Sequence, residues 1–421
     1  MTKRKKTHVF LIFLIIISFG CTDSTEVISE STNTVIPVAE LTEEQTQVDE
    51  VSLDRSLPAG KLEASIDNGF GDSNNNSVVA LDVYKDYLYA SVMQLFERKS
   101  SIWRFDGETW SVVLEEGLNN GQLVIEDFLA YKGYFYAGTT DALNDIPGVG
   151  GEVWRTEDGF EWIKVFGDEI ENNDDHTEIG RLFEFNGEIF VSTWTYNETP
   201  NGGLEIWKSK TGEIGSWVKV ASNGIDNHEN LGAICDAIHD NKLFIGTVGT
   251  TVFPDEEKKG WGHVFYTRDG ENWERAGKIG NGEIYNVSGL AELDDHLYAS
   301  LIAYESREKG GEIYRCSVCD GSDWELVFDG PYTHDFTGRK QSLEVYEGIL
   351  YYLVGNQENG VELWRTHNGT DWENVASEGI NDKNNMKPYW DNSMVVFRNK
   401  LYFGMDNFGD SGTQVWVFYH E

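Results

Sequence analysis

Basic residues are scarce in this 421-residue chain. It has 33 lysines and arginines against 72 aspartates and glutamates, a formal net charge of −39. Four of the basic residues lie in the first twenty positions, so 29 basic residues remain against 72 acidic ones after them. Such a surface repels nucleic acids and anionic membranes. We therefore expect neither as a direct partner, and a solvated acidic surface is the plainest explanation of the charge.

Cysteines are also few, with four in the chain. Cys235 falls in an apolar strand pattern and is expected to be a small core residue. Cys316 and Cys319 lie in a hairpin segment two residues longer than its counterparts in the sequence, where a disulfide is expected outside the cell. A CxxC redox or zinc role is the weaker alternative, because no second ligand pair is evident.

Patterns of helical period are missing, and a repeat takes their place. An apolar strand, a two-residue turn and an aromatic strand recur every 47 to 54 residues. The seven turns are Lys85-Asp86, Lys132-Gly133, Asn186-Gly187, Asp240-Asn241, Asp294-Asp295, Glu347-Gly348 and Arg398-Asn399. A second hairpin follows the first six turns, as in Gly151–Val165, and a third strand alone follows the seventh. A period of this size predicts radial units, namely a seven-bladed β-propeller of four-stranded antiparallel blades.

Tryptophans recur at equivalent places in the second hairpins. The third strands contain Trp103, Trp154, Trp207, Trp364 and Trp416, and the fourth strands open on Trp110, Trp162, Trp217, Trp273, Trp324 and Trp372. Large aromatic residues at repeated positions are typical of a core. We expect them to pack between neighbouring sheets.

The last repeat lacks a fourth strand, and the chain supplies a candidate for it near its beginning. Lys61–Asn76 reads like Trp372–Asn385 and like Val218–Asn230, which follow or form fourth strands. We therefore predict that Leu62–Ile66 pairs with Gln414–Tyr419. This pairing closes the ring and removes an exposed sheet edge.

The second hairpins carry short boxes, Thr156-Glu157-Asp158-Gly159 before Trp162 and Thr267-Arg268-Asp269-Gly270 before Trp273. This pattern resembles the Asp-box repeats of sialidase-type β-propellers, although both boxes are one residue shorter. The resemblance covers roughly residues 60–420 and implies blade architecture. The box is a structural turn, and no Arg-Ile-Pro segment stands near the first repeat, so no catalytic residue is carried over.

The N-terminus has the features of an export signal. Basic residues at Lys3–Lys6 precede the apolar run Val9–Ile17, which is too short for a stable membrane helix. Gly20-Cys21 resembles a prokaryotic lipoprotein processing site, with Cys21 lipidated; ordinary secretion is the alternative, because Ser18 departs from the usual aliphatic residue. We expect a signal peptide over 1–20, a disordered acidic tether over 21–56 and the propeller over 57–421, at the cell envelope or surface.

The long loops between second and third strands and between repeats should share one face, the loop face; the short turns form the opposite turn face. Loops on a rigid scaffold carry function. Exposed aromatics on the loop face favour binding of a glycan or a protein by a monomer; packing between loops is the alternative. The predicted ligand-binding residues are Trp194, Tyr196, Trp261, Tyr304, Tyr389 and Trp390.

Carboxylates near the predicted channel support a second hypothesis, a glycoside hydrolase or lyase. Glu126, Asp127 and Asp236 should lie there, with Arg181 and His176 nearby. No catalytic residue is assigned, because an acidic chain forms such pairs by chance. No cofactor is expected; calcium in the Asn- and Asp-rich connections is the alternative to their use as turn residues.

Overall fold

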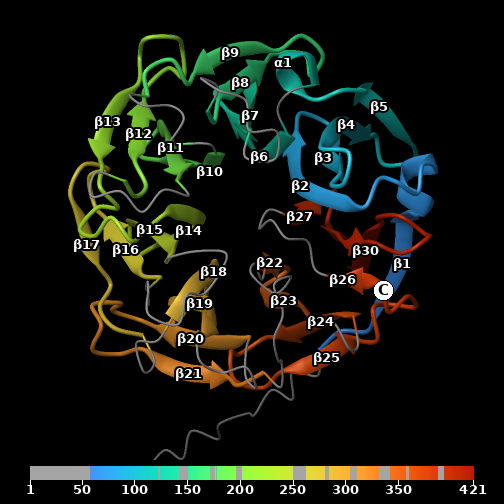
Figure 1. Ribbon diagram of the computed structural model, residues 1–421. Coiled ribbons are helices and arrows are strands. Elements are labelled where there is room, and N and C mark those ends of the chain that lie inside the picture. Colours follow the sequence, from blue (N-terminus) through green and yellow to red (C-terminus); the bar gives the residue numbers. More distant parts are fainter. Residues whose placement is uncertain are drawn as a thin grey trace, which may run out of the picture. The chain divides into compact units, whose positions relative to one another are not determined.

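A computed structural model describes residues 57–121, 124–141, 150–170, 176, 178–195, 202–249, 262–279, 284–303, 311–330, 342–356, 360–386 and 393–421. The described part is antiparallel β-structure, with one 3₁₀ turn, Asn68–Gly71, and one short helix, α1 (Leu118–Gly121). No helix in this part is long and apolar enough to cross a membrane. Figure 1 shows the sheets set around a common middle.

The strands follow the chain in runs of hairpins. They are β2 (Ser77–Tyr84), β3 (Tyr87–Gln94), β4 (Lys99–Phe105) and β5 (Trp110–Leu114); β6 (Val124–Tyr131), β7 (Tyr134–Thr140), β8 (Val153–Thr156) and β9 (Ile163–Phe166); β10 (Glu178–Phe185), β11 (Glu188–Trp194), β12 (Ile206–Ser209) and β13 (Val218–Ala221); β14 (Gly232–His239), β15 (Lys242–Val248), β16 (Val264–Thr267) and β17 (Trp273–Arg275).

The remaining runs are β18 (Ile284–Leu293), β19 (His296–Ala303), β20 (Glu312–Cys316) and β21 (Glu325–Phe328); β22 (Ser342–Tyr346), β23 (Ile349–Asn356), β24 (Gly360–Thr366) and β25 (Glu373–Ala376); and β27 (Met394–Phe397), β28 (Lys400–Gly404) and β30 (Val415–His420), with the two-residue strands β26 (Asn385–Met386) and β29 (Asp406–Asn407). The sheets contain four, eight, eight, six and four strands, because single residue pairs such as Glu178 with Thr140 join neighbouring runs.

The first strand of the described structure pairs with the last. β1 (Gly60–Ile66) lies antiparallel to β30, with Leu62 opposite Phe418 and Ile66 opposite Val415. The predicted pairing of Leu62–Ile66 with the C-terminal strand is therefore confirmed. It places β1 on the outside of the sheet β1-β30-β28-β27 (Figure 1).

The hairpin turns have the predicted backbone. Lys132 and Gly133 have φ of 46° and 82°, and Asp240 and Asn241 have 48° and 56°. Positive φ at both positions is the mark of a type I′ turn, which matches the twist of the flanking strands. Glycine or asparagine stands at the second position in five of the seven turns, because both tolerate this region. The first turn differs, since only Lys85 of Lys85-Asp86 has a positive φ.

The tryptophans of the second hairpins pack as predicted. In the fourth strands, the Trp217 indole donates to the Val165 carbonyl at 3.0 Å and the Trp324 indole to the Ala276 carbonyl at 2.8 Å, each in the preceding run. The Trp110 indole likewise reaches Ser65 of β1 at 3.0 Å. These three bonds tie the third run to the second, the fifth run to the fourth, and the first run to β1.

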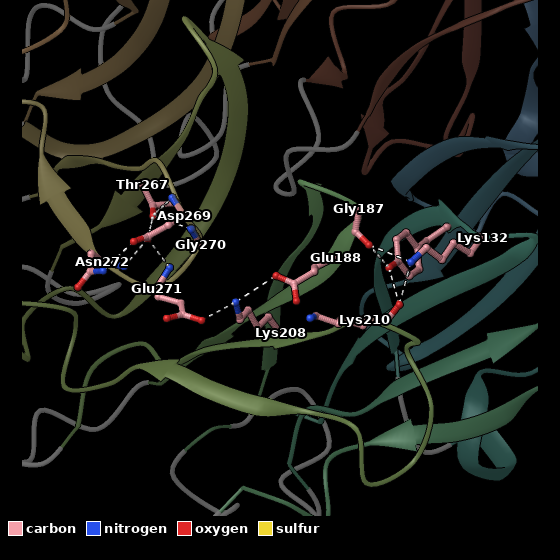
Figure 2. A network of polar contacts seen from close by, with 11 residues as sticks. Lys132, Gly187, Glu188, Lys208, Lys210, Thr267, Asp269, Gly270, Glu271 and Asn272 are labelled. Carbon is pink, nitrogen blue, oxygen red and sulfur yellow. Dashed lines mark hydrogen bonds and ion pairs between the residues drawn. The ribbon is translucent and has the colours of Figure 1, made fainter.

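The two boxes form the same turn. The Asp269 carboxylate accepts the backbone N–H groups of Glu271 and Asn272, while Gly270 N–H donates to Thr267 Oγ1 at 2.9 Å (Figure 2). Asp158 and Thr156 repeat this arrangement. The N–H donors stabilise the charged form, so the pKa values of both aspartates are lowered. Both carboxylates therefore act as turn caps, in agreement with a structural box.

Side chains of one turn also bind the next run. Lys132 Nζ donates to the carbonyls of Gly187 and Lys210, both at 2.9 Å, and the Tyr131 hydroxyl reaches the same two oxygens (Figure 2). Arg398 Nη2 makes the corresponding contact from the last run to the first, with the Asp86 carbonyl at 3.2 Å. The polar groups of the turn face thus hold the ring together.

Candidate functional site: a polar cluster among the innermost strands

Five charged side chains meet among the strands nearest the middle of Figure 1. We call them the central cluster: Asp82 of β2, Asp127 of β6, Arg181 of β10, Asp236 of β14 and Glu344 of β22. Asp127 and Arg181 follow β-bulges in their strands, between Ile125 and Asp127 and between Ile179 and Arg181. A bulge re-aims the side chains that follow it, so this irregularity shapes the centre.

Arg181 holds two of the carboxylates. Its Nε donates to Asp236 Oδ1 at 2.8 Å, and its Nη1 contacts Asp127 Oδ1 at 3.2 Å. The other oxygen of Asp127 accepts the Leu182 backbone N–H at 2.7 Å. The Asp127 side chain is 3% exposed, whereas those of Arg181 and Asp236 are 20% and 19% exposed. Asp127 therefore anchors the arginine from a buried position, whereas Arg181 and Asp236 are partly exposed.

The other two carboxyls have unusual acidities. Burial raises the pKa of Asp82 to about 7; the Val83 N–H opposes this shift, the Asp127 charge adds to it, and Arg181 opposes it. Burial also raises the pKa of Glu344 to about 7, against the charge of Arg181 and together with that of Asp82. Asp82 and Glu344 are thus half protonated near neutral pH, and they lie beside Asp127 and Asp236, which pair with the arginine. Such a set of carboxyls can give and take protons.

Two other sequence candidates have clear places. Glu126 is the bulged residue of β6 and is buried. The contacts of His176 include Thr193 Oγ1, 3.0 Å from its Nδ1, and Glu205, 3.9 Å from its Nε2. The grouping of Asp127, Asp236 and Arg181 was predicted, and it is present. Asp82 and Glu344 were missed, although a lone acid in an apolar strand was a usable signal.

The aromatic prediction needs a correction at Trp194. This side chain is 7% exposed and packs in a core cluster with Ile234 and Val248, and a Cβ at Gly232 would touch its ring. Packing against the next run, rather than exposure on the loop face, explains this tryptophan. Tyr196, Trp261, Tyr304, Tyr389 and Trp390 lie outside the described residues.

An aromatic pair that sequence reasoning missed, with one exposed and one partly buried ring, lies on the loop face. Phe96, between β3 and β4, is 79% exposed, and its ring centroid is 6.0 Å from that of Phe408, between β29 and β30. Both belong to loops between second and third strands. Neither position recurs in the repeat, so periodicity gave no signal for them.

The Asn-rich connections have a structural use in three places. The side-chain amides of Asn75, Asn230 and Asn385 donate to the carbonyls of Gly69, Gly224 and Gly379, at 2.8, 2.8 and 2.9 Å. All three asparagines are buried. Within the described ranges, no group of three or more His, Cys, Asp or Glu side chains is arranged to hold a metal ion.

The cysteines are placed as expected in two regions. Cys316 and Cys319 form a disulfide in the turn after β20, and both are buried. Cys235 is a buried residue of β14. Its Sγ lies 3.4 Å from the Val287 carbonyl of the next run.

Comparisons with known proteins give a fold and no family. No family model matches the chain, and no curated protein matches it. Among solved structures, polysaccharide lyase Uly1 is similar with 12% identity and a TM-score of 0.51, over 82% of this chain and 90% of that one. A PL25 ulvan lyase bound to -[GlcA(1-4)Rha3S]- has 12% identity and a TM-score of 0.50, over 81% and 93%.

A third similar structure comes from a study of two prolyl endopeptidases, with 11% identity and a TM-score of 0.50. It matches 83% of this chain but only 51% of that protein. Identities this low show the fold alone. The chain is thus an all-β protein whose curled sheets form a propeller-like fold.

Proposed function

We propose that this chain is an exported recognition protein that binds a glycan on the loop face, over the central cluster. In this proposal residues 1–20 are a signal peptide, Cys21 carries the lipid, residues 21–56 are a tether, and residues 57–421 form seven four-stranded blades. The protein acts as a monomer at the cell envelope or surface, with the membrane reached through the lipid.

One observation carries the proposal: the charges of the central cluster break the repeat. The repeats can be compared by counting residues back from the first residue of each first hairpin turn. The third residue back is Asp82 or Glu344 in two repeats, and it is Leu, Phe, Ala, Ala or Val in the other five. The fourth is Asp236 in one repeat and Leu, Phe or Met in the other six. Buried charge costs stability unless it is compensated. The other repeats have apolar residues at these positions, so the fold does not need charges there. The cost of the charges therefore favours a role in binding.

The exposed ring of Phe96, packed beside Phe408, supports the choice of a glycan. Exposed aromatic rings mark recognition surfaces, and flat rings beside carboxylates suit the apolar faces and hydroxyls of sugars. Two of the structures with this fold are polysaccharide lyases, which shows that such a scaffold can present a saccharide site. The acidic surface favours a neutral glycan over an anionic one.

A glycan array probed with the wild-type chain and with Phe96→Ala tests this function. Loss of the aromatic platform should weaken binding at least tenfold. Phe160→Ala is the matched control, because Phe160 is also half exposed but lies in a turn of the opposite face. Absence of binding by the wild-type chain, or equal loss in both variants, contradicts the proposal; binding to a protein panel alone points to the protein ligand.

A glycoside hydrolase or lyase is the second candidate, and the raised pKa values of Asp82 and Glu344 favour it. A carboxyl with a pKa of about 7 can protonate a leaving group at neutral pH, while an ionised neighbour acts as base or nucleophile. Incubation with neutral and acidic polysaccharides should release reducing ends or unsaturated sugars. Asp82→Asn and Glu344→Gln should remove that activity, and no product across a broad panel rejects the enzyme.

A further inference from the structure

A groove of about 610 Å³ lies on the rim of the ring, between the loop after β13 and the turn that opens β17. Its walls include Val220, Ile225 and His228 on one side and Glu271, Asn272 and Trp273 on the other. This volume is within the range of small-ligand sites. The groove is separate from the central cluster, since none of its lining residues belongs to an innermost strand.

A second junction of the same kind, between a fourth strand and the following run, has its groove filled by a side chain. The loop Asn223-Gly224-Ile225 matches Asn68-Gly69-Phe70, and the last residues, Ile225 and Phe70, have similar positive φ values of 72° and 59°. Phe70 is buried, and its ring lies 5.1 Å from Trp103 and 5.3 Å from Trp110. Ile225 is smaller and only partly buried. The missing ring leaves space beside Trp273.

Trp273 also differs from its counterparts. Among the six fourth-strand tryptophans, it has neither an aromatic-ring contact nor a hydrogen bond from its indole within the described residues. Trp162 and Trp372 also lack an indole partner, but rings of Phe135 and Phe328 pack on them. The Trp273 N–H is itself buried from solvent, so the part of this residue that a ligand in the groove can meet is its ring.

The groove walls are rigid and carry little net charge. Asp269 caps the turn that bears Glu271 and Asn272, and Lys208 pairs with both Glu188 and Glu271, at 3.0 and 3.1 Å (Figure 2). On the other wall, Asp226 pairs with Arg275. Asp226 thus has its own cation, while Glu271 shares Lys208 with Glu188. The Asn272 amide nitrogen donates to Asp269 at 2.7 Å, which leaves its side-chain oxygen and the His228 imidazole for hydrogen bonding.

We propose that this groove is a second saccharide site, which takes a neutral oligosaccharide. The sugar lies against the ring of Trp273, and its hydroxyls bond to the side-chain oxygen of Asn272 and to the His228 imidazole. No unpaired cation lines the groove, so an anionic sugar has no counter-charge there. The inference rests on the proposed glycan-binding function and adds a site distinct from the loop face.

Ile225→Phe tests it, because this change copies Phe70 of the sister loop and fills the groove. Titration of the full chain with short cello-, manno- and xylo-oligosaccharides should give at least a tenfold weaker Kd for this variant. Ile214→Phe is the control, since it adds the same ring at an exposed turn position. His228→Ala, which removes one proposed donor, should weaken binding without reducing the melting temperature.

An independent signal keeps the test decisive if Ile225→Phe folds poorly. The indole N–H resonance of Trp273, assigned with Trp273→Phe, should move on addition of the bound oligosaccharide. Oligosaccharide binding that leaves this resonance and His228→Ala unaffected overturns the rim site and leaves the loop-face proposal standing. No binding of any neutral saccharide by the wild-type chain overturns both proposals.

Discussion

The turn face and the centre of the ring use polar residues in opposite ways. On the turn face, Lys132 and Tyr131 bind the same two backbone oxygens of the next run, and Asp269 caps its own turn. In the centre, charged residues stand where the sister repeats are apolar, and two carboxyls have pKa values of about 7. Residues that follow the repeat build the scaffold, whereas those that depart from it mark candidate sites.

The largest expected effect comes from breaking the scaffold at its closure. Deletion of residues 57–66 removes β1 and exposes the edge of β30. It also removes Ser65, the acceptor of the Trp110 indole. We expect the melting temperature, measured by calorimetry, to fall by roughly 10 °C or more. Deletion of ten residues within 40–49 is the control; an equal melting temperature for both deletions contradicts the closure.

The next effect concerns Arg181, the cation of the central cluster. Arg181→Met leaves Asp127 and Asp236 without their counter-charge, and Asp127 is almost fully buried. Unfolding by urea should show a loss of about 3–5 kcal/mol. The triple change Arg181→Met, Asp127→Asn and Asp236→Asn should recover most of it. A single variant as stable as the wild type shows that the pairs contribute nothing to folding.

The pH dependence of stability separates the two regions further. The folded-state pKa values of Asp82 and Glu344 lie above their unfolded values, so the folded state retains protons that the unfolded chain releases between about pH 4 and pH 7. Their contribution is present below pH 4 and is lost as the pH rises through 7. We expect a decrease on the order of 2 kcal/mol over this window.

Urea unfolding at a series of pH values measures this decrease. The double variant Asp82→Asn, Glu344→Gln cannot titrate there, so its stability should change much less between pH 4 and pH 8. The turn aspartates have lowered pKa values and act in the opposite direction, below about pH 4. Equal slopes in the wild type and the double variant exclude the two carboxyls as the cause.

The scaffold could be predicted from the sequence because its residues recur from repeat to repeat. The tryptophan positions, the turns and the pairing of β1 were readable from similarity between repeats. Asp82 and Glu344 were missed because their acidity depends on which strands face each other across the ring, which no local pattern records. Trp194 was misplaced for a related reason: its burial comes from the next run, packed over it. Phe96 and the groove beside Ile225 each depart from the repeat at a single place. They become apparent when equivalent loops of different repeats are compared in the structure.

The smallest effect tests the claim that the boxes are purely structural. Thr267→Val keeps the shape of the side chain but leaves the buried Gly270 N–H without its acceptor, at a cost of about 1–2 kcal/mol. Thr156 and Thr366 make the same bond to Gly159 and Gly369 at 2.9 Å. The three sites are in separate runs, so the losses should add, and Thr→Ser at each site should cost less. Because the boxes belong to the scaffold, glycan binding should stay constant throughout this series. A loss of binding in a variant that keeps its stability would mean that the boxes take part in binding.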